Sequence, residues 1–160
     1  MTLRRAPLLG VGAALLAAGS TACSDLGTDV MGRIQELADH RQLWQATRPA
    51  AYVYAVERLC FCALAGPVRV TVSDGAVTER VYVESGELVP EQQGDLYPTV
   101  DGLFDLLANA MGTGAHEVTV TYDEATGVPT DFWIDYQENV ADEELGMRVT
   151  EPVSPTDAGT

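Results

Sequence analysis

The clearest pattern in this chain is the alternation of apolar and polar residues along two segments. In residues 68–83, valines alternate with polar side chains on either side of Asp74 and Gly75, a pair that favours a two-residue hairpin turn. In residues 118–135, a similar alternation flanks a turn at 123–127. A period of two residues is typical of strands that bury one face. The pattern therefore predicts two antiparallel hairpins.

A further strand is predicted at residues 52–62, but its buried face is ambiguous. Apolar residues occupy both faces of this segment, interrupted by Glu57 on one face and by Arg58 on the other. The pattern thus identifies a strand without indicating which side faces the core.

Two amphipathic helices are predicted, one before the first strand and one between the hairpins. Apolar residues recur at helical spacing over residues 31–48, and Pro49 ends the pattern. The second helix covers residues 99–111, with Thr99 as its expected N-cap and two glycines, at 112 and 114, as its end. We interpret the apolar stripes of both helices as core.

The order of the elements is helix, three strands, helix, two strands, which predicts an α+β fold. We expect an antiparallel sheet of about five strands, built as a meander plus a hairpin, with two helices packed on one face. Residues 31–150 form the single domain. Residues 151–160 are rich in Pro, Ser, Thr, Asp and Gly, and we expect a disordered tail there.

The first 30 residues predict secretion and lipid attachment. Two arginines precede an apolar run at residues 6–18, which is shorter than the roughly 20 residues that a membrane-spanning helix needs. Small residues, Ser20 and Ala22, stand just before Cys23, as in the lipobox of bacterial lipoproteins. We therefore predict a signal peptide at 1–22, lipidation of Cys23 and a lipidated tether at 23–30, which place the protein outside the cytoplasm on the cell membrane. Ordinary cleavage with an unmodified thiol is the alternative.

The charge of the chain excludes several classes of function. The 160 residues carry 24 acidic and nine basic side chains, a formal net charge of −15, and there is no lysine. This charge repels phosphate backbones, so nucleic acid is not an expected partner. The missing lysine excludes Schiff-base catalysis and a phosphate-loop lysine. No motif calls for a cofactor.

Cys60 and Cys62 are the sharpest candidates for chemistry. Residues two apart in a strand face the same side, with Cα atoms about 6.6–6.8 Å apart, at the upper limit for a disulfide. An extracytoplasmic compartment favours oxidation, so we predict that the two cysteines form a disulfide. Reduced buried thiols and a redox or metal role are the alternatives. A zinc site would need further ligands, and His40 and His116 stand at no recognisable spacing.

Acidic residues offer two further hypotheses. The clusters Asp123-Glu124 and Asp142-Glu143-Glu144 could supply oxygen ligands for calcium, although no calcium-loop pattern is present and solvated surface is the simpler interpretation. Asp131, Trp133 and Asp135 share one face of the last predicted strand and place an indole between two carboxylates. Such a face could bind a cationic or aromatic partner, although a single exposed aromatic residue needs no such explanation.

Several short motifs, taken together, resemble a known family. They are Tyr52-Val53-Tyr54 before Cys60-Phe61-Cys62, Gly66-Pro67-Val68-Arg69-Val70 before Asp74-Gly75, Thr99-Val100-Asp101-Gly102-Leu103-Phe104, and Tyr122-Asp123, Gly127, Pro129, Ile134-Asp135-Tyr136, Asn139 and Asp142-Glu143 in the last part of the domain. In these the chain resembles an uncharacterised bacterial lipoprotein family, domain of unknown function 6174. The resemblance implies no established activity, so it assigns no functional residue.

The functional hypothesis from the sequence is a membrane-anchored extracytoplasmic lipoprotein that acts as a non-enzymatic binding module. Its expected partners are the membrane, through the lipid anchor, and a basic or aromatic protein or cell-envelope surface. Two alternatives stay open: a thiol redox protein that uses Cys60 and Cys62, and a hydrolase of cell-envelope material without a recognisable motif.

Overall fold

A computed structural model describes residues 25–60, 66–140 and 142–156, with side chains from residue 30 onward. Cys23 and Cys62 lie outside these residues. The helices are α1 (Asp25–Thr47), the short 3-10 helix η1 (Glu91–Leu96) and α2 (Val100–Thr113); the strands are β1 (Ala51–Leu59), β2 (Val68–Ser73), β3 (Ala76–Tyr82), β4 (Glu117–Tyr122), β5 (Pro129–Asp135) and β6 (Leu145–Pro155).

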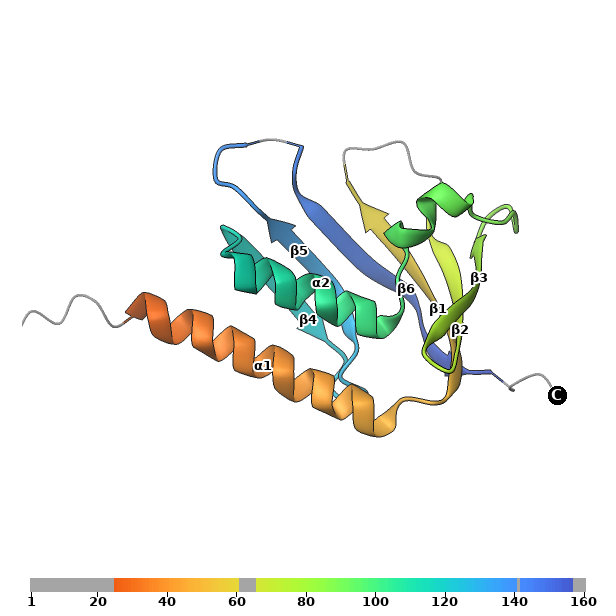
Figure 1. Ribbon diagram of the computed structural model, residues 1–160, viewed down its shortest axis with the longest axis horizontal. Coiled ribbons are helices and arrows are strands. Elements are labelled where there is room, and N and C mark those ends of the chain that lie inside the picture. Colours follow the sequence, from red (N-terminus) through yellow and green to blue (C-terminus); the bar gives the residue numbers. More distant parts are fainter. Residues whose placement is uncertain (1–24, 61–65, 141, 157–160) are drawn as a thin grey trace, which may run out of the picture.

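The strands form one antiparallel sheet in the order β3-β2-β1-β6-β5-β4. Figure 1 shows helices α1 and α2 side by side on the same face of this sheet. The predicted α+β class, the meander and the hairpin are confirmed. The sheet has six strands instead of the predicted number of about five, because a further strand, β6, joins the meander to the hairpin.

Strand β6 also corrects the predicted tail, since residues 151–155 belong to it. Strand β6 accommodates its prolines because they lie where its pairing with the neighbouring strands is interrupted or ends. Pairing with β5 ends at Asp131 and Arg148, and Pro152 lies in a register shift against β1, between the residues that pair with Val53 and Ala55. A proline is tolerated at a bulge, where its missing N–H breaks no ladder hydrogen bond.

Helix α1 begins at Asp25, six residues before the predicted start at Met31. The first helical residues therefore fall within the segment 23–30 that the sequence assigns to the tether. Acidic residues at a helix N-terminus interact favourably with the helix dipole, and the segment 25–30 carries two of them. No helix in the described part of the chain is long and apolar enough to cross a membrane.

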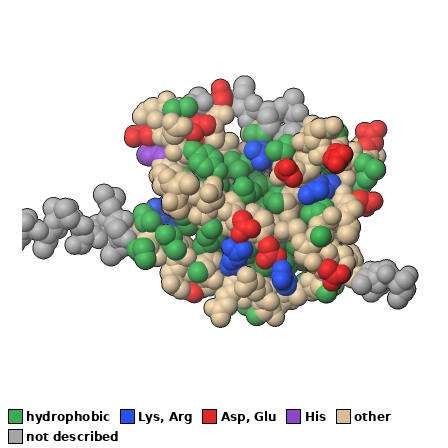
Figure 2. All heavy atoms as spheres, in the orientation of Figure 1, with side chains coloured by type: hydrophobic (Ala, Val, Ile, Leu, Met, Phe, Trp, Pro, Cys, Tyr) green, Lys and Arg blue, Asp and Glu red, His purple; other side chains and the backbone are tan. Residues whose placement is uncertain are grey.

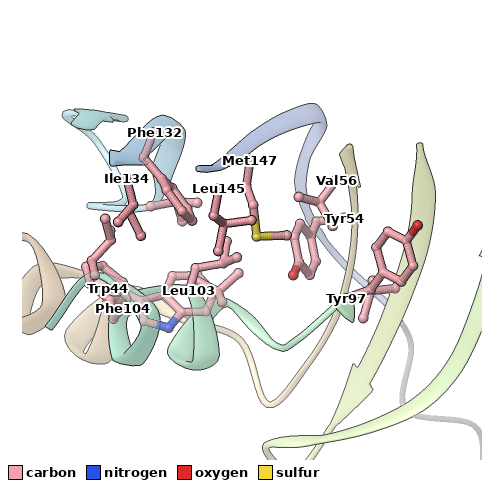
Figure 3. Close-up of a cluster of buried hydrophobic side chains, with 14 of the residues drawn as sticks. Trp44, Tyr54, Val56, Tyr97, Leu103, Phe104, Phe132, Ile134, Leu145 and Met147 are labelled. Carbon is pink, nitrogen blue, oxygen red and sulfur yellow. The ribbon is translucent and has the colours of Figure 1, made fainter. Parts of the chain in front are cut away.

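The core lies between α2 and the sheet. Thr99 caps α2 by accepting a hydrogen bond from the N–H of Gly102 at 3.1 Å, which confirms the predicted N-cap, and Gly114 ends the helix in the left-handed conformation, whereas Gly112 lies within the helix. Figure 3 shows how α2 and α1 meet the sheet through buried side chains, among them Trp44, Tyr54, Val56, Leu103, Phe104, Phe132, Ile134, Leu145 and Met147. Arg58, in the ambiguous strand, points to this helix side, because it pairs with Met147.

Candidate functional site: the open face of the sheet

The face of the sheet opposite the helices carries the outward side chains of the strands. Strand register places Trp133, Gly146 and Leu59 in one row across β5, β6 and β1. Asp131 and Arg148 lie in the next row. We call this surface, centred on Trp133, the open face.

Trp133 is the exposed aromatic residue at the centre of this face, with 40% of its surface accessible. Its indole lies directly over Gly146, where an added Cβ would come within 2.6 Å of the indole Cε3 and 2.9 Å of the Leu59 Cβ. Gly146 therefore leaves the space that the ring occupies. The indole is held against the sheet and does not project freely into solvent.

Asp131 and Asp135 flank Trp133 along β5, as the alternation of the sequence indicates. Asp131 accepts a hydrogen bond from Nε of Arg148 at 2.6 Å, which raises the pKa of Arg148. Asp135 accepts a hydrogen bond from the backbone N–H of Gln137 at 3.0 Å. Both members of the Asp131–Arg148 pair are largely exposed, so this pair contributes little to stability. It fixes the position of the Asp131 carboxylate.

A second ion pair on the same face covers Ala55, which is fully buried. Arg69 donates two hydrogen bonds to Glu151, at 2.9 and 2.6 Å, and these hydrogen bonds lower the pKa of Glu151. The sequence interpretation missed Glu151 and Arg148, because both lie in or near the segment assigned to a tail. Alternation of apolar and polar residues over 145–149 was the available signal.

The open face is acidic around Trp133. On β4, β5, β6, β1 and β2, five described carboxylates face outward with two guanidinium groups, those of Arg148 and Arg69; the acidic residues are Glu57, Glu117, Asp131, Asp135 and Glu151. This arrangement can attract a cation and offer it an aromatic surface.

The cysteine prediction stays a prediction. Cys60 follows β1 directly, but Cys62 and Cys23 lie outside the described residues. The disulfide and the lipidation are therefore untested by the fold.

Asp123 serves the β4–β5 turn. Its Oδ1 accepts hydrogen bonds from the N–H of Ala125 and from both the N–H and the hydroxyl of Thr126, at 2.8–3.0 Å. Thr126 thereby lowers the pKa of Asp123. Glu144 similarly accepts from the N–H of Asp142 at 3.1 Å.

Metal-binding geometry is also missing from the part of the chain that the structure describes. There, no three His, Cys, Asp or Glu side chains lie close enough to share a metal ion. The calcium hypothesis receives no support from these residues.

His40 packs against Tyr122 in a parallel stack with ring centroids 4.0 Å apart. Its Nδ1 is buried and meets no hydrogen-bond partner within the described part of the chain. A cavity of about 150 Å³ lies where β5 and β6 separate; it is lined by Asp123, Thr126, Val128, Thr130, Val149, Pro152 and Val153. Among the described lining residues the ionisable group is Asp123, whose carboxylate is engaged in the turn by Ala125 and Thr126.

The chain belongs to the family described as "Family of unknown function (DUF6174)", whose model matches residues 36–153. The match begins within α1 and takes in β1 to β5 and most of β6. No curated protein and no solved structure matches this chain.

Proposed function

We propose that this protein is an extracytoplasmic binding module, held at the membrane by a lipid on Cys23, that binds its partner through the open face. The observation that carries the proposal is Trp133, an exposed indole held over Gly146 and surrounded by outward carboxylates. Aromatic residues in fixed positions are typical anchors of binding surfaces, since little side-chain entropy is lost when they bind.

The chemistry of this surface favours a basic or aromatic partner. A guanidinium or ammonium group could lie over the indole and pair with Asp135 or Glu117 at the same time. The molecule as a whole carries a net charge of −15, which speeds the approach of cations and repels nucleic acid. The ion pairs at Arg148 and Arg69 would keep the surrounding carboxylates in place.

The start of α1 supports a position close to the bilayer. Only Ser24 separates Cys23 from the first helical residue, so a lipid on Cys23 would lie within about 7 Å of the helix. Val30, Met31 and Ile34 are exposed in the first turns of α1 and lie near one another at helical spacing. These apolar side chains would then contact the membrane interface.

Binding at the open face can be tested with a synthetic peptide of alternating Arg and Tyr. We expect saturable binding to the purified protein, a loss of about tenfold or more in affinity in Trp133→Ala, and weakening as salt rises. Gln42→Ala is the control, since Gln42 is exposed on α1, which covers the other face of the sheet. Equal affinity of Trp133→Ala and the native protein would exclude this surface, as would unfolding of Trp133→Ala.

Lipidation can be tested by mass spectrometry of the mature N-terminus from the native host. We expect a mature chain that begins at Cys23 and carries acyl chains. An unmodified Cys23, together with partition of the protein into the aqueous phase of a detergent extract, would remove the anchor from the proposal.

A further inference from the structure

Arg58 differs from the other arginines that the structure describes. Arg33, Arg41, Arg48, Arg69, Arg80 and Arg148 each interact with a carboxylate or a backbone carbonyl. Within the described part of the chain, Arg58 has no hydrogen bond and no ion pair, although the protein has 24 acidic residues. A half-buried cation without a counter-charge is costly, so its position calls for an explanation.

The strand register places Arg58 on the helix side of the sheet, at the end of β1. It pairs with Met147, which is 1% exposed, and follows Val56, which is fully buried on the same side. Burial lowers the pKa of Arg58, and the rings of Tyr97 and Tyr136 lie near enough to act on it. The guanidinium thus stands at the edge of the apolar core, away from the open face.

The hydroxyl of Tyr97 is a second, independent indication that a ligand binds near Arg58. Its side chain is fully buried, and its hydroxyl has no hydrogen-bond partner among the residues that the structure describes. In Figure 3 this hydroxyl points away from α2, in the direction in which β1 runs towards its end. A buried hydroxyl without a partner loses the hydrogen bonds that water would give it, which an acceptor oxygen would restore.

We propose that Arg58 and Tyr97 form a binding site for a small monocarboxylate with an apolar body. The planar guanidinium can donate two parallel hydrogen bonds to a carboxylate, and one carboxylate oxygen can accept a third from the Tyr97 hydroxyl. A single arginine matches a single negative charge. A dianion would bear more repulsion from the negative field of the molecule.

The surroundings suit an apolar ligand body. Leu96, Leu106 and Tyr136 are only partly buried against the core. Leu106 lies roughly 100–140° around α2 from Asp105 and Asp101, which pair with Arg41 and Arg48 in and directly after α1, so it faces away from α1. Figure 2 shows hydrophobic side chains at the surface along the upper edge of α2, with a basic side chain at their border. An aliphatic chain could lie along this edge.

The site can be tested by calorimetric titration of the purified protein with octanoate, octan-1-ol and octyl phosphate. We expect saturable octanoate binding, weaker binding of the alcohol and the phosphate, and a loss of about tenfold or more in octanoate affinity in Arg58→Gln. Tyr97→Phe should weaken octanoate binding by a smaller factor. Arg148→Gln removes the same charge from the open face and should leave the affinity unchanged.

The proposal is overturned if octanoate does not saturate the native protein, if Arg58→Gln binds it as tightly, or if octyl phosphate binds more tightly than octanoate. Circular dichroism checks the fold of each variant. Should Arg58→Gln unfold, Arg58→Lys keeps the charge without the fork geometry and is expected to bind octanoate more weakly; unchanged affinity in that variant also overturns the site.

Discussion

Gly127 shows at the scale of one residue why the β4–β5 turn fits against α1. Its φ is +78°, and an added Cβ would lie 2.2 Å from the carbonyl oxygen of His40 and 3.1 Å from the backbone nitrogen of Trp44. The turn therefore packs on the helix backbone itself. The sequence predicts the turn but not this contact. Glycine is common in turns of every kind, and the sequence does not show that the backbone of α1 lies against this one.

Gly127→Ala should destabilise the fold by about 2–3 kcal/mol, from backbone strain together with the clash against α1. Gly75→Ala is a matched control, because Gly75 has the same φ of +78° with nothing within 4 Å of the added Cβ. Urea denaturation of both variants separates the strain from the clash. Equal losses in the two variants would show that the contact with α1 is not tight.

Tyr52 predicts how stability depends on pH. Burial raises the pKa of Tyr52 from 10.0 to about 12, and its hydroxyl accepts a hydrogen bond from the N–H of Val100 at 3.2 Å. The unfolded chain loses this proton near pH 10 and the folded chain does not, so the stabilisation is complete below pH 10 and is lost as the pH rises towards 12. Burial raises the pKa of Tyr54 and Tyr122 in the same direction.

The free energy of unfolding should therefore fall between pH 10 and pH 12, and fall less in Tyr52→Phe than in the native protein. Urea denaturation at several pH values measures both slopes. A slope in Tyr52→Phe that equals the native slope would show that this residue does not couple folding to alkaline pH.

At the scale of elements, the parts of the fold with strong local patterns were predictable and β6 was not. The Asp74-Gly75 hairpin, the Thr99 cap and the stripe of α2 are all visible in short windows of sequence. Strand β6 contains two prolines, and its residues beyond Arg148 pair with β1, a strand nearly 100 residues earlier in the chain. Long-range pairing of this kind leaves no local signature, and proline argues against a strand.

The same limit applies to the candidate site. Alternation predicted that Asp131, Trp133 and Asp135 share a face. It could not show that Gly146 lies beneath the indole or that Arg148 pairs with Asp131, since both contacts come from β6. The ambiguity of Glu57 and Arg58 was resolved by pairing with the same strand.

Removal of residues 151–160 tests the role of β6. We expect the melting temperature to fall by at least about 5 °C, because the deletion removes the Arg69–Glu151 pair and the last part of the β1–β6 ladder. Removal of residues 157–160 alone should have no such effect, since β6 ends at Pro155. If the two truncated proteins have the same melting temperature, the last residues of β6 contribute nothing to the stability of the sheet.

At the scale of the whole molecule, the two proposed sites lie on opposite faces of one sheet. The open face is acidic and carries an exposed indole, whereas the helix side carries the guanidinium of Arg58 beside apolar side chains. Six strands and a shared core join them, and under the proposed function the start of α1 would set their position relative to the proposed lipid on Cys23. If the test of one site excludes that site, the other proposal is unaffected, because the two sites share no residue.

The most direct test of the open face is nuclear magnetic resonance mapping of the alternating Arg and Tyr peptide on the isotope-labelled protein. Binding at this face should shift the indole Nε1–H of Trp133 and the amides of Thr119 and Gly146, its neighbours across β4 and β6. Resonances of α1 and α2 should stay in place. Shifts confined to the helix side, or no shifts at saturating peptide, would contradict the proposed binding surface.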